Sequence, residues 1–349
     1  MTGADLLLNS LRSQGRACAA LGSPMYGELL QRVVADVSAG GVFAQILAGH
    51  EHDDGRLAVP LRLLGGLHRL VLDGRAPELR RWYPSTGGSW AADAAWPRIT
   101  SVAADHISAL RAALSQPPQT NEVGRAAALI GGLLVLADQF PLPIMLFEIG
   151  SSAGLNLRAD HYRYRYPGGH WGPAGSPVTV DDAWHGKLPP SATVQIVERE
   201  GYDIAPVDAT TPDGEVTLLS YVWPDMTPRF DRLRGAIEIA RGVPAPVLRR
   251  AAADAVAGLR LTEGTVTVLW HSVVWQYLSA GEQAAVDAGI NALAAQADAR
   301  SPFAHLTFEP QRRTPDAAVA FLLRARTWPG GADHVLAECG PHGPPVIWE

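Results

Sequence analysis

The segment that decides the fold reads Ile144-Met145-Leu146-Phe147-Glu148-Ile149-Gly150-Ser151-Ser152-Ala153-Gly154-Leu155-Asn156. Its first six residues form an apolar run with a single acid, which is typical of a strand buried on both faces of a sheet. Two glycines then allow a sharp turn and the close approach of a ligand, and a helix-like pattern begins at Leu155. Open α/β sheets bind ligands at such a turn, where the helix N-terminus offers free N–H groups. The segment therefore predicts a ligand-binding α/β sheet.

Strand and helix patterns alternate on both sides of this segment. We expect strands at 144–149, 193–198, 216–223, 265–271, 305–309, 319–326 and 334–339. Helical patterns lie between several of them, at 120–140, 227–241, 246–259 and 281–299. This alternation predicts a mostly parallel sheet covered on both faces. Because only a short turn joins the last two strands, one of them must run antiparallel. The predicted fold class is α/β with a seven-stranded sheet.

The rest of the chain predicts two further parts. Residues 1–115 carry helical periodicity with polar turns between the segments, which predicts a helical domain that caps the α/β domain. The α/β domain is expected to span 116–349. Within it, residues 161–193 form an insertion, which begins with alternating tyrosine and arginine and predicts a strand with one aromatic face.

Composition narrows the classes of function. The 349-residue chain is 18% charged, below the ~25% of an average domain, so a large buried core is expected. Its net charge is -6 and it has no basic block, which argues against a nucleic-acid partner. The apolar stretch 126–147 is interrupted by glycines, prolines and Asp138, so it is too broken for a membrane span. Since the N-terminus has no signal-peptide pattern, we expect a soluble cytoplasmic protein without a membrane partner.

Metal and disulfide chemistry are not expected. The two cysteines, Cys18 and Cys339, lie near opposite ends of the chain and form neither a zinc motif nor a disulfide framework. The cluster His50-Glu51-His52-Asp53-Asp54 has no helical ligand spacing and no cysteine partner. We interpret this cluster as a solvated loop.

The pattern Glu148-x-Gly150-x-x-x-Gly154 resembles the first motif of class I S-adenosylmethionine (SAM) methyltransferases. The resemblance covers about residues 120–349 and implies a Rossmann-like sheet of seven strands, the last one antiparallel. The segments 147–157, 222–225 and 270–278 also look like those of a bacterial family of unknown function with a methyltransferase-like core. That second resemblance implies a fold without an assigned reaction.

The resemblance assigns SAM contacts to particular residues. It places the methionine portion against the glycine loop and the start of the helix, at Gly150, Ser151, Gly154 and Asn156. Glu148 would orient the amino group. An acid at the end of the second strand would accept both ribose hydroxyls, and either Glu198 or Asp203 fits that description. One departure from the family pattern is that Ser152 replaces the middle glycine.

Candidates for the reacting end follow the later strands. His271 closes the fourth expected strand, and its pKa range suits a base that deprotonates an oxygen or nitrogen nucleophile. Asp225 closes the third and is a second candidate base, or else a helix cap. Five side chains are candidates for substrate binding, through charge or as an aromatic wall: Arg125, Tyr162, Tyr164, Trp275 and Tyr277.

A second template fits the same loop. Gly150-Ser151-Ser152-Ala153-Gly154 matches G-x-S-x-G, the nucleophile elbow of α/β-hydrolases. Ser152 would then be the nucleophile, with Asp225 and either His334 or His342 completing the triad. No oxyanion segment precedes the loop, and Glu148 has no role in that mechanism.

The sequence therefore supports three hypotheses about the function of the protein. The first is a SAM-dependent methyltransferase that acts on a small-molecule O- or N-nucleophile. The second is a non-catalytic module that binds SAM or a nucleotide. The third is a serine esterase of the α/β-hydrolase type.

Overall fold

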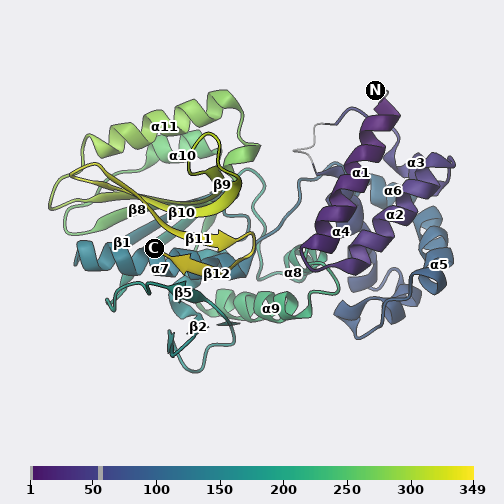
Figure 1. The fold of residues 1–349 in the computed structure, drawn as a ribbon, viewed down its shortest axis with the longest axis horizontal. Coiled ribbons are helices and arrows are strands. Elements are labelled where there is room, and N and C mark those ends of the chain that lie inside the picture. The colour runs from purple at the N-terminus through teal and green to yellow at the C-terminus, as the bar shows by residue number, and fades with distance from the viewer. Residues whose placement is uncertain (1–2, 54–57) are drawn as a thin grey trace. The chain divides into compact units, whose positions relative to one another are not determined.

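The computed structural model describes residues 3–53 and 58–349, and the chain divides into two compact units. A helical unit consists of Met1–Thr120 with Thr211–Asp231, and an α/β unit consists of Asn121–Thr210 with Arg232–Glu349. The helical unit thus includes Thr211–Asp231, which the sequence analysis assigned to the α/β domain. Figure 1 shows the course of the chain through both units.

Helices build the first unit around a core of leucine, valine and aromatic side chains. α2 shows how the sequence sets an element: Ser23 caps it by accepting the Tyr26 N–H, and Pro24 occupies its first turn. The elements are α1 Gly3–Ala20, α2 Pro24–Ser38, α3 Val42–Leu47, α4 Val59–Leu72, η2 Pro77–Trp82, η3 Pro84–Thr86, α5 Ala92–Asp105, α6 Ile107–Leu114, α8 Pro212–Ser220 and the first residues of α9 Thr227–Gly242.

The prediction of a strand at 216–223 is wrong. The structure has helix α8 there, begun by Thr211, whose hydroxyl accepts the Gly214 N–H, and by Pro212 in the first turn. A short apolar run does not distinguish a strand from a helix by periodicity alone. The helix-start signals before this run, Thr211 as the N-cap and Pro212 in the first turn, favour a helix.

The α/β unit is built on one sheet of nine strands among its described residues, rather than the seven predicted. Its order is β5-β12-β11-β10-β9-β8-β1-β6-β7. The strands are β1 Ile144–Ile149, β5 Trp184–Gly186, β6 Ile196–Asp203, β7 Val247–Arg249, β8 Val266–Ser272, β9 Phe303–Arg312, β10 Val319–Trp328, β11 Ala332–Gly340 and β12 Gly343–Trp348. The short edge strands β5 and β7 and the last strand β12 were missed in the sequence, and β7 lies within the helix predicted at 246–259.

Five strands, β7, β6, β1, β8 and β9, run parallel and form a doubly wound half. From β1 the chain moves outward to β6 and β7, and then returns to the other side of β1 to form β8 and β9. The strand order therefore reverses between β1 and β8, which is where such sheets bind ligands. Strands β10, β11 and β12 continue from β9 as an antiparallel meander, so the predicted hairpin near the C-terminus is present, and β5 pairs in parallel with β12 at the edge.

Helices cover both faces of this sheet (Figure 1). α7 Ala126–Gln139 lies on one face, while α10 Ala252–Gly258 and α11 Ala280–Ala294 lie on the other. Phe147 and Ile149 point from β1 into the core with α10 and α11, so Glu148 points to the α7 face because side chains alternate along a strand. Short 3₁₀ turns complete the unit: η4 Val123–Arg125, η5 Leu155–His161 and η6 Trp275–Tyr277.

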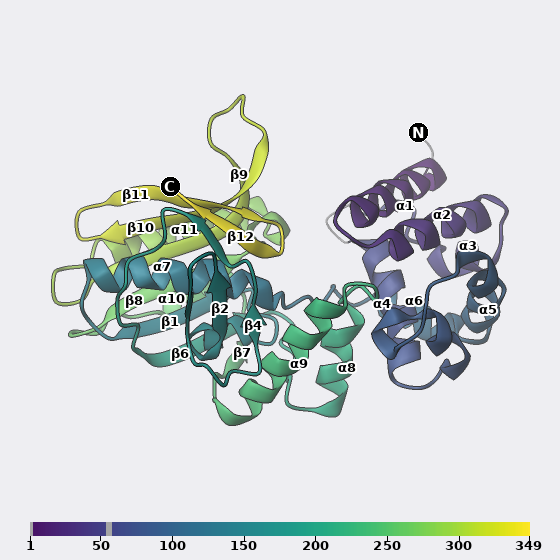
Figure 2. The ribbon, with the colours of Figure 1, turned by 60° about the horizontal axis from the view of Figure 1, so that its bottom comes forward.

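The insertion after η5 forms a small sheet of its own, with strands β2 Arg163–Tyr166, β3 Gly169–Trp171 and β4 Thr179–Val180 (Figure 2). The predicted strand of alternating tyrosine and arginine is β2. Tyr162 and Tyr164 are fully buried, and their hydroxyls donate to the carbonyls of Leu155 and Ala159. Both side chains therefore belong to the core of the insertion rather than to a surface that a substrate reaches.

Candidate functional site

The glycine loop, Gly150–Gly154, lies at the carboxyl end of β1 and bends over the end of β6. The N–H groups of Gly150 and Ser151 both donate to the Tyr202 carbonyl. Gly150 and Gly154 have φ of +67° and +64°, a region where side chains are strained. These two glycines are required by the backbone. The segment after the loop is the 3₁₀ turn η5 and not the predicted α-helix, so a helix N-terminus is not part of this site.

Asp203 is the last residue of β6 and holds the glycine loop in place. Its Oδ2 accepts the Ser152 N–H at 2.8 Å, and its Oδ1 accepts the Ala205 N–H at 2.9 Å. Glu198 lies earlier in β6, is exposed, and pairs with Met145. Of the two acids proposed for the end of the second strand, Asp203 occupies that position and Glu198 does not.

Glu148 is buried beneath the loop, with 2% of its surface exposed. Its Oε1 accepts the indole N–H of Trp270 at 3.0 Å, while its buried Oε2 has no hydrogen-bond partner. Burial, with a smaller contribution from the charge of Asp203, raises the pKa of Glu148 to about 8. The carboxyl group is therefore mostly protonated at neutral pH.

Valines pack against both glycines of the loop. A Cβ on Gly150 would lie 2.3 Å from Cγ2 of Val274, and one on Gly154 would lie 2.7 Å from Cγ2 of Val247. Val274 follows β8, and the residue before it, Val273, has a φ of +54°. This conformation is costly for a β-branched residue. A strained turn therefore holds Val274 against the loop.

A cavity of about 520 Å³, here called the loop cavity, opens beside the glycine loop. Ala153 and Arg158 line it from the loop side, and the segment Pro206–Thr210 lines it directly after β6. Val247 and the residues before it complete the wall. Its volume lies within the 300–1,000 Å³ range of small-molecule sites.

His271, the penultimate residue of β8, is buried on the α11 face of the sheet. Its Nδ1 lies 2.7 Å from Oε1 of Glu309 on β9, and that oxygen also accepts the N–H groups of Val274 and Trp275. Trp275 stacks on the imidazole with ring centroids 5.4 Å apart. Position and partner together give His271 the geometry of an oriented base.

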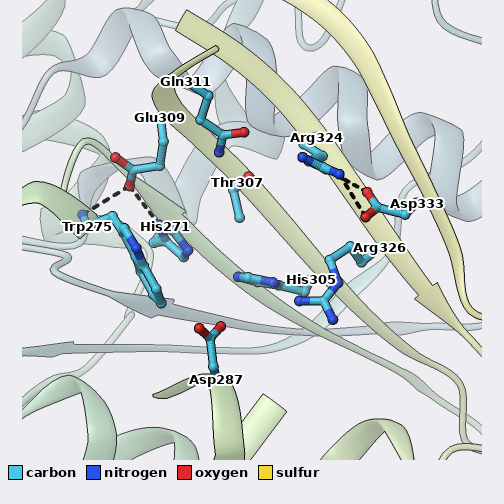
Figure 3. Close-up of a pocket in the computed structure, with 10 residues that line it drawn as sticks. All are labelled: His271, Trp275, Asp287, His305, Thr307, Glu309, Gln311, Arg324, Arg326 and Asp333. Atoms are coloured by element: carbon cyan, nitrogen blue, oxygen red, sulfur yellow. Dashed lines mark hydrogen bonds and ion pairs between the residues drawn. The ribbon is translucent and has the colours of Figure 1, made fainter. Parts of the chain in front are cut away.

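His271, Trp275 and Glu309 line a second cavity of about 330 Å³, here called the sheet-face cavity (Figure 3). Strand β9 contributes His305, Thr307, Glu309 and Gln311 at alternate positions, and β10 contributes Arg324 and Arg326. The sequence analysis did not identify Glu309 or His305. The signal was present, because His305, Thr307 and Glu309 alternate along the strand expected at 305–309, which places all three on one face.

The remaining candidate residues lie elsewhere. Asp225 belongs to the helical unit, where its carboxylate accepts the Ser23 hydroxyl and the Met25 N–H at the start of α2. The prediction that Asp225 closes a strand is therefore wrong. Asp225 follows helix α8 and binds the start of helix α2. Tyr277 is 51% exposed.

Arg125 and Asn156 connect η4 to the carboxyl edge of the sheet. The guanidinium of Arg125 lies 3.5 Å from the Ser272 carbonyl, at the end of β8, and over the Phe308 ring. The buried Asn156 amide donates to the Glu122 carbonyl at 3.3 Å. Both side chains stabilise the segments around the loop.

One structural observation supports the hydrolase hypothesis. Ser152 has a φ of +53°, which fits the strained turn of a nucleophile elbow. However, Asp225 is bound within the helical unit. His334 lies near the start of β11, and β11 runs parallel to β1, so His334 is at the opposite edge of the sheet. Of the proposed triad partners, only His342, in the turn after β11, lies at the same edge as Ser152.

Among residues 3–53 and 58–349, no three His, Cys, Asp or Glu side chains form a group that could hold a metal ion. No helix in that part of the chain combines the length and apolar character needed to cross a membrane.

The family follows from a comparison with known sequences, in which a family profile matches residues 9–348. The chain belongs to the family described as "Uncharacterized protein conserved in bacteria (DUF2332)". This agrees with the resemblance to a bacterial family of unknown function. No curated protein and no solved structure matches the chain. Membership in this family assigns no activity to the chain.

Proposed function

We propose that this protein is a SAM-dependent methyltransferase that acts on a small-molecule oxygen or nitrogen nucleophile. One observation carries the proposal: Asp203 ends β6 beside the glycine loop, next to the point where the strand order reverses between β1 and β8. A glycine loop and a neighbouring strand-end acid at that point are the parts that recognise a nucleoside.

The nucleoside end of SAM fits the residues present. A carboxylate has about four acceptor positions, and two of those on Asp203 are used by the N–H groups of Ser152 and Ala205. The other positions would accept the two ribose hydroxyls. The loop cavity begins three residues after Asp203 and has enough volume for the rest of the nucleoside.

The part of the glycine loop that would contact the methionine end of SAM is partly covered by the Val274 side chain. Val274 lies against Gly150, so a ligand that approached the backbone there would displace the Val274 side chain. Below the loop, Oε2 of Glu148 is buried without a hydrogen-bond partner and would accept from the ammonium group. Binding a cation would favour the charged form of Glu148, and the carboxyl group would then release its proton.

Bound SAM supplies a methyl group on a positively charged sulfur. The residues of this chain would supply position and a base. His271 has its Nδ1 engaged by Glu309, so Nε2 is the nitrogen that would take the proton from the acceptor's hydroxyl or amine. Trp275 packs on the ring and limits the orientations it can adopt.

The test uses the full chain with methyl-labelled SAM and a small-molecule extract of bacterial cells. The proposal predicts a labelled product with the wild type, its loss in His271→Gln, and unchanged SAM affinity in that variant. Binding without transfer to any compound would support the non-catalytic module instead. The absence of SAM binding would overturn the proposal.

A further inference from the structure

The floor of the sheet-face cavity is built of buried polar groups that lack partners. Nε2 of His271, both ring nitrogens of His305, Oγ1 of Thr307 and Oε2 of Glu309 are buried without a hydrogen bond. All four residues line the cavity, and each is at most 7% exposed. Buried polar groups are nearly always hydrogen-bonded in folded proteins. Five unpartnered polar atoms on four side chains at one cavity indicate a polar molecule that binds there.

The protonation of the floor follows from its contacts. Oε1 of Glu309 accepts two backbone N–H groups, so it also accepts from His271, whose Nδ1 must carry the proton. Nε2 of a neutral His271 is then an acceptor. Burial above all, together with the nearby positive charge of Arg326, lowers the pKa of His305 well below its usual value. The neutral His305 ring presents one donor and one acceptor, and Thr307 presents a hydroxyl.

Two arginines of β10, Arg324 and Arg326, line the cavity. Arg324 forms a bidentate ion pair with Asp333. Arg326 lies over the Trp328 ring, and within the described residues its guanidinium has neither a hydrogen bond nor an ion pair. Figure 3 shows Arg326 beside His305, and Asp287 pointing from α11 toward the strand residues. Arg326 is therefore the group available to an anion, while Asp287 favours a ligand with hydroxyl or amine donors nearby.

We propose that the sheet-face cavity binds a small hydroxylated organic anion, of the sugar-phosphate or sugar-acid class. Its phosphate or carboxylate would pair with Arg326. Its hydroxyl groups would donate to Nε2 of His271 and Oε2 of Glu309, and exchange hydrogen bonds with His305 and Thr307. That this molecule is the methyl acceptor rests on the proposed function; its binding does not.

The test is calorimetric titration of the full chain without SAM, using glucose 6-phosphate, gluconate, glucose and inorganic phosphate. At least one of the two hydroxylated anions should bind, and glucose or phosphate should bind at least tenfold more weakly. The comparison of glucose 6-phosphate with gluconate decides between phosphate and carboxylate. Because no SAM is present, the result is independent of the loop cavity.

Two variants locate the binding. Arg326→Gln should weaken it at least tenfold, whereas Arg312→Gln should leave it unchanged, since Arg312 is exposed on β9 and alternation places it on the other face. Thr307→Val keeps the side-chain shape and should weaken binding severalfold. The proposal is overturned if neither anion binds the wild type, or if binding is equal in wild type, Arg326→Gln and Thr307→Val.

Discussion

Nδ1 of His271 lies 2.7 Å from Oε1 of Glu309, and the same oxygen accepts the N–H groups of Val274 and Trp275. One carboxylate thus orients the candidate base and also fixes the turn whose Val274 covers the glycine loop. A change at Glu309 should therefore affect both cavities.

The first prediction concerns the tautomer of His271. In protein labelled with ¹⁵N-histidine, NMR should show His271 protonated at Nδ1, because Oε1 of Glu309 can only accept. In Glu309→Gln, whose amide can also donate, this preference should weaken. His68, buried in the helical unit, is a control whose signals should not change. An Nε2-protonated His271 in the wild type would contradict the proposed role as base.

The second prediction concerns the contact between Gly150 and Val274. Gly150→Ala should destabilise the α/β unit by about 2–4 kcal/mol, since it adds left-handed strain and overpacking. Gly264→Ala is the control, because Gly264 has a φ of +81° and open space around it, so only strain is added. Combining Gly150→Ala with Val274→Ala should recover part of the loss in urea unfolding. Equal losses at Gly150 and Gly264 would show that Val274 does not press on the loop.

The third prediction concerns pH. The pKa of Glu148 is about 8 in the folded state against 4.5 for the free group. The folded state therefore binds the extra proton between these values, and stability falls as pH rises from about 4.5 to 8. The shift corresponds to roughly 4–5 kcal/mol. Glu148→Gln should flatten this slope in urea unfolding measured at pH 5, 6.5 and 8. An unchanged slope would assign the pH dependence to other groups.

The fourth prediction concerns Asp225. Because its carboxylate accepts the Ser23 hydroxyl and the Met25 N–H, Asp225→Ala should destabilise the helical unit by about 1–2 kcal/mol. The affinity for S-adenosylhomocysteine, measured by calorimetry, should not change. A loss of affinity without a loss of stability would restore Asp225 as a ligand-binding residue.

The central part of the sheet could be predicted from sequence because its strands are continuous apolar runs. β1 was predicted with the bounds that the structure shows, and β8 to within one residue. The end of β6 was misplaced because the strand is half exposed, and polar residues such as Arg199 and Glu200 continue the pairing past the predicted end at residue 198. β7 has three residues, too few for any periodicity.

The site was predictable only where a local motif marks it. The glycine loop, Glu148 and His271 stand at strand ends that can be recognised in the sequence, whereas the misplaced end of β6 left Glu198 and Asp203 as alternatives. Glu309 and Arg326 reach the sheet-face cavity through pairing of β9 with β8 and β10, a register that separates partners widely along the chain. Tyr162 and Tyr164 looked accessible because alternation does not tell which face of an insertion is buried.

The most direct measurement of the central claim is calorimetric titration with S-adenosylhomocysteine, which needs no acceptor. The wild type should bind it, and Asp203→Asn should bind at least tenfold more weakly, because two hydrogen bonds to a charged group are weakened. Glu198→Gln, which alters the rival acid on the same strand, should bind like the wild type. No binding by the wild type, or equal binding by all three proteins, would contradict SAM recognition at the glycine loop.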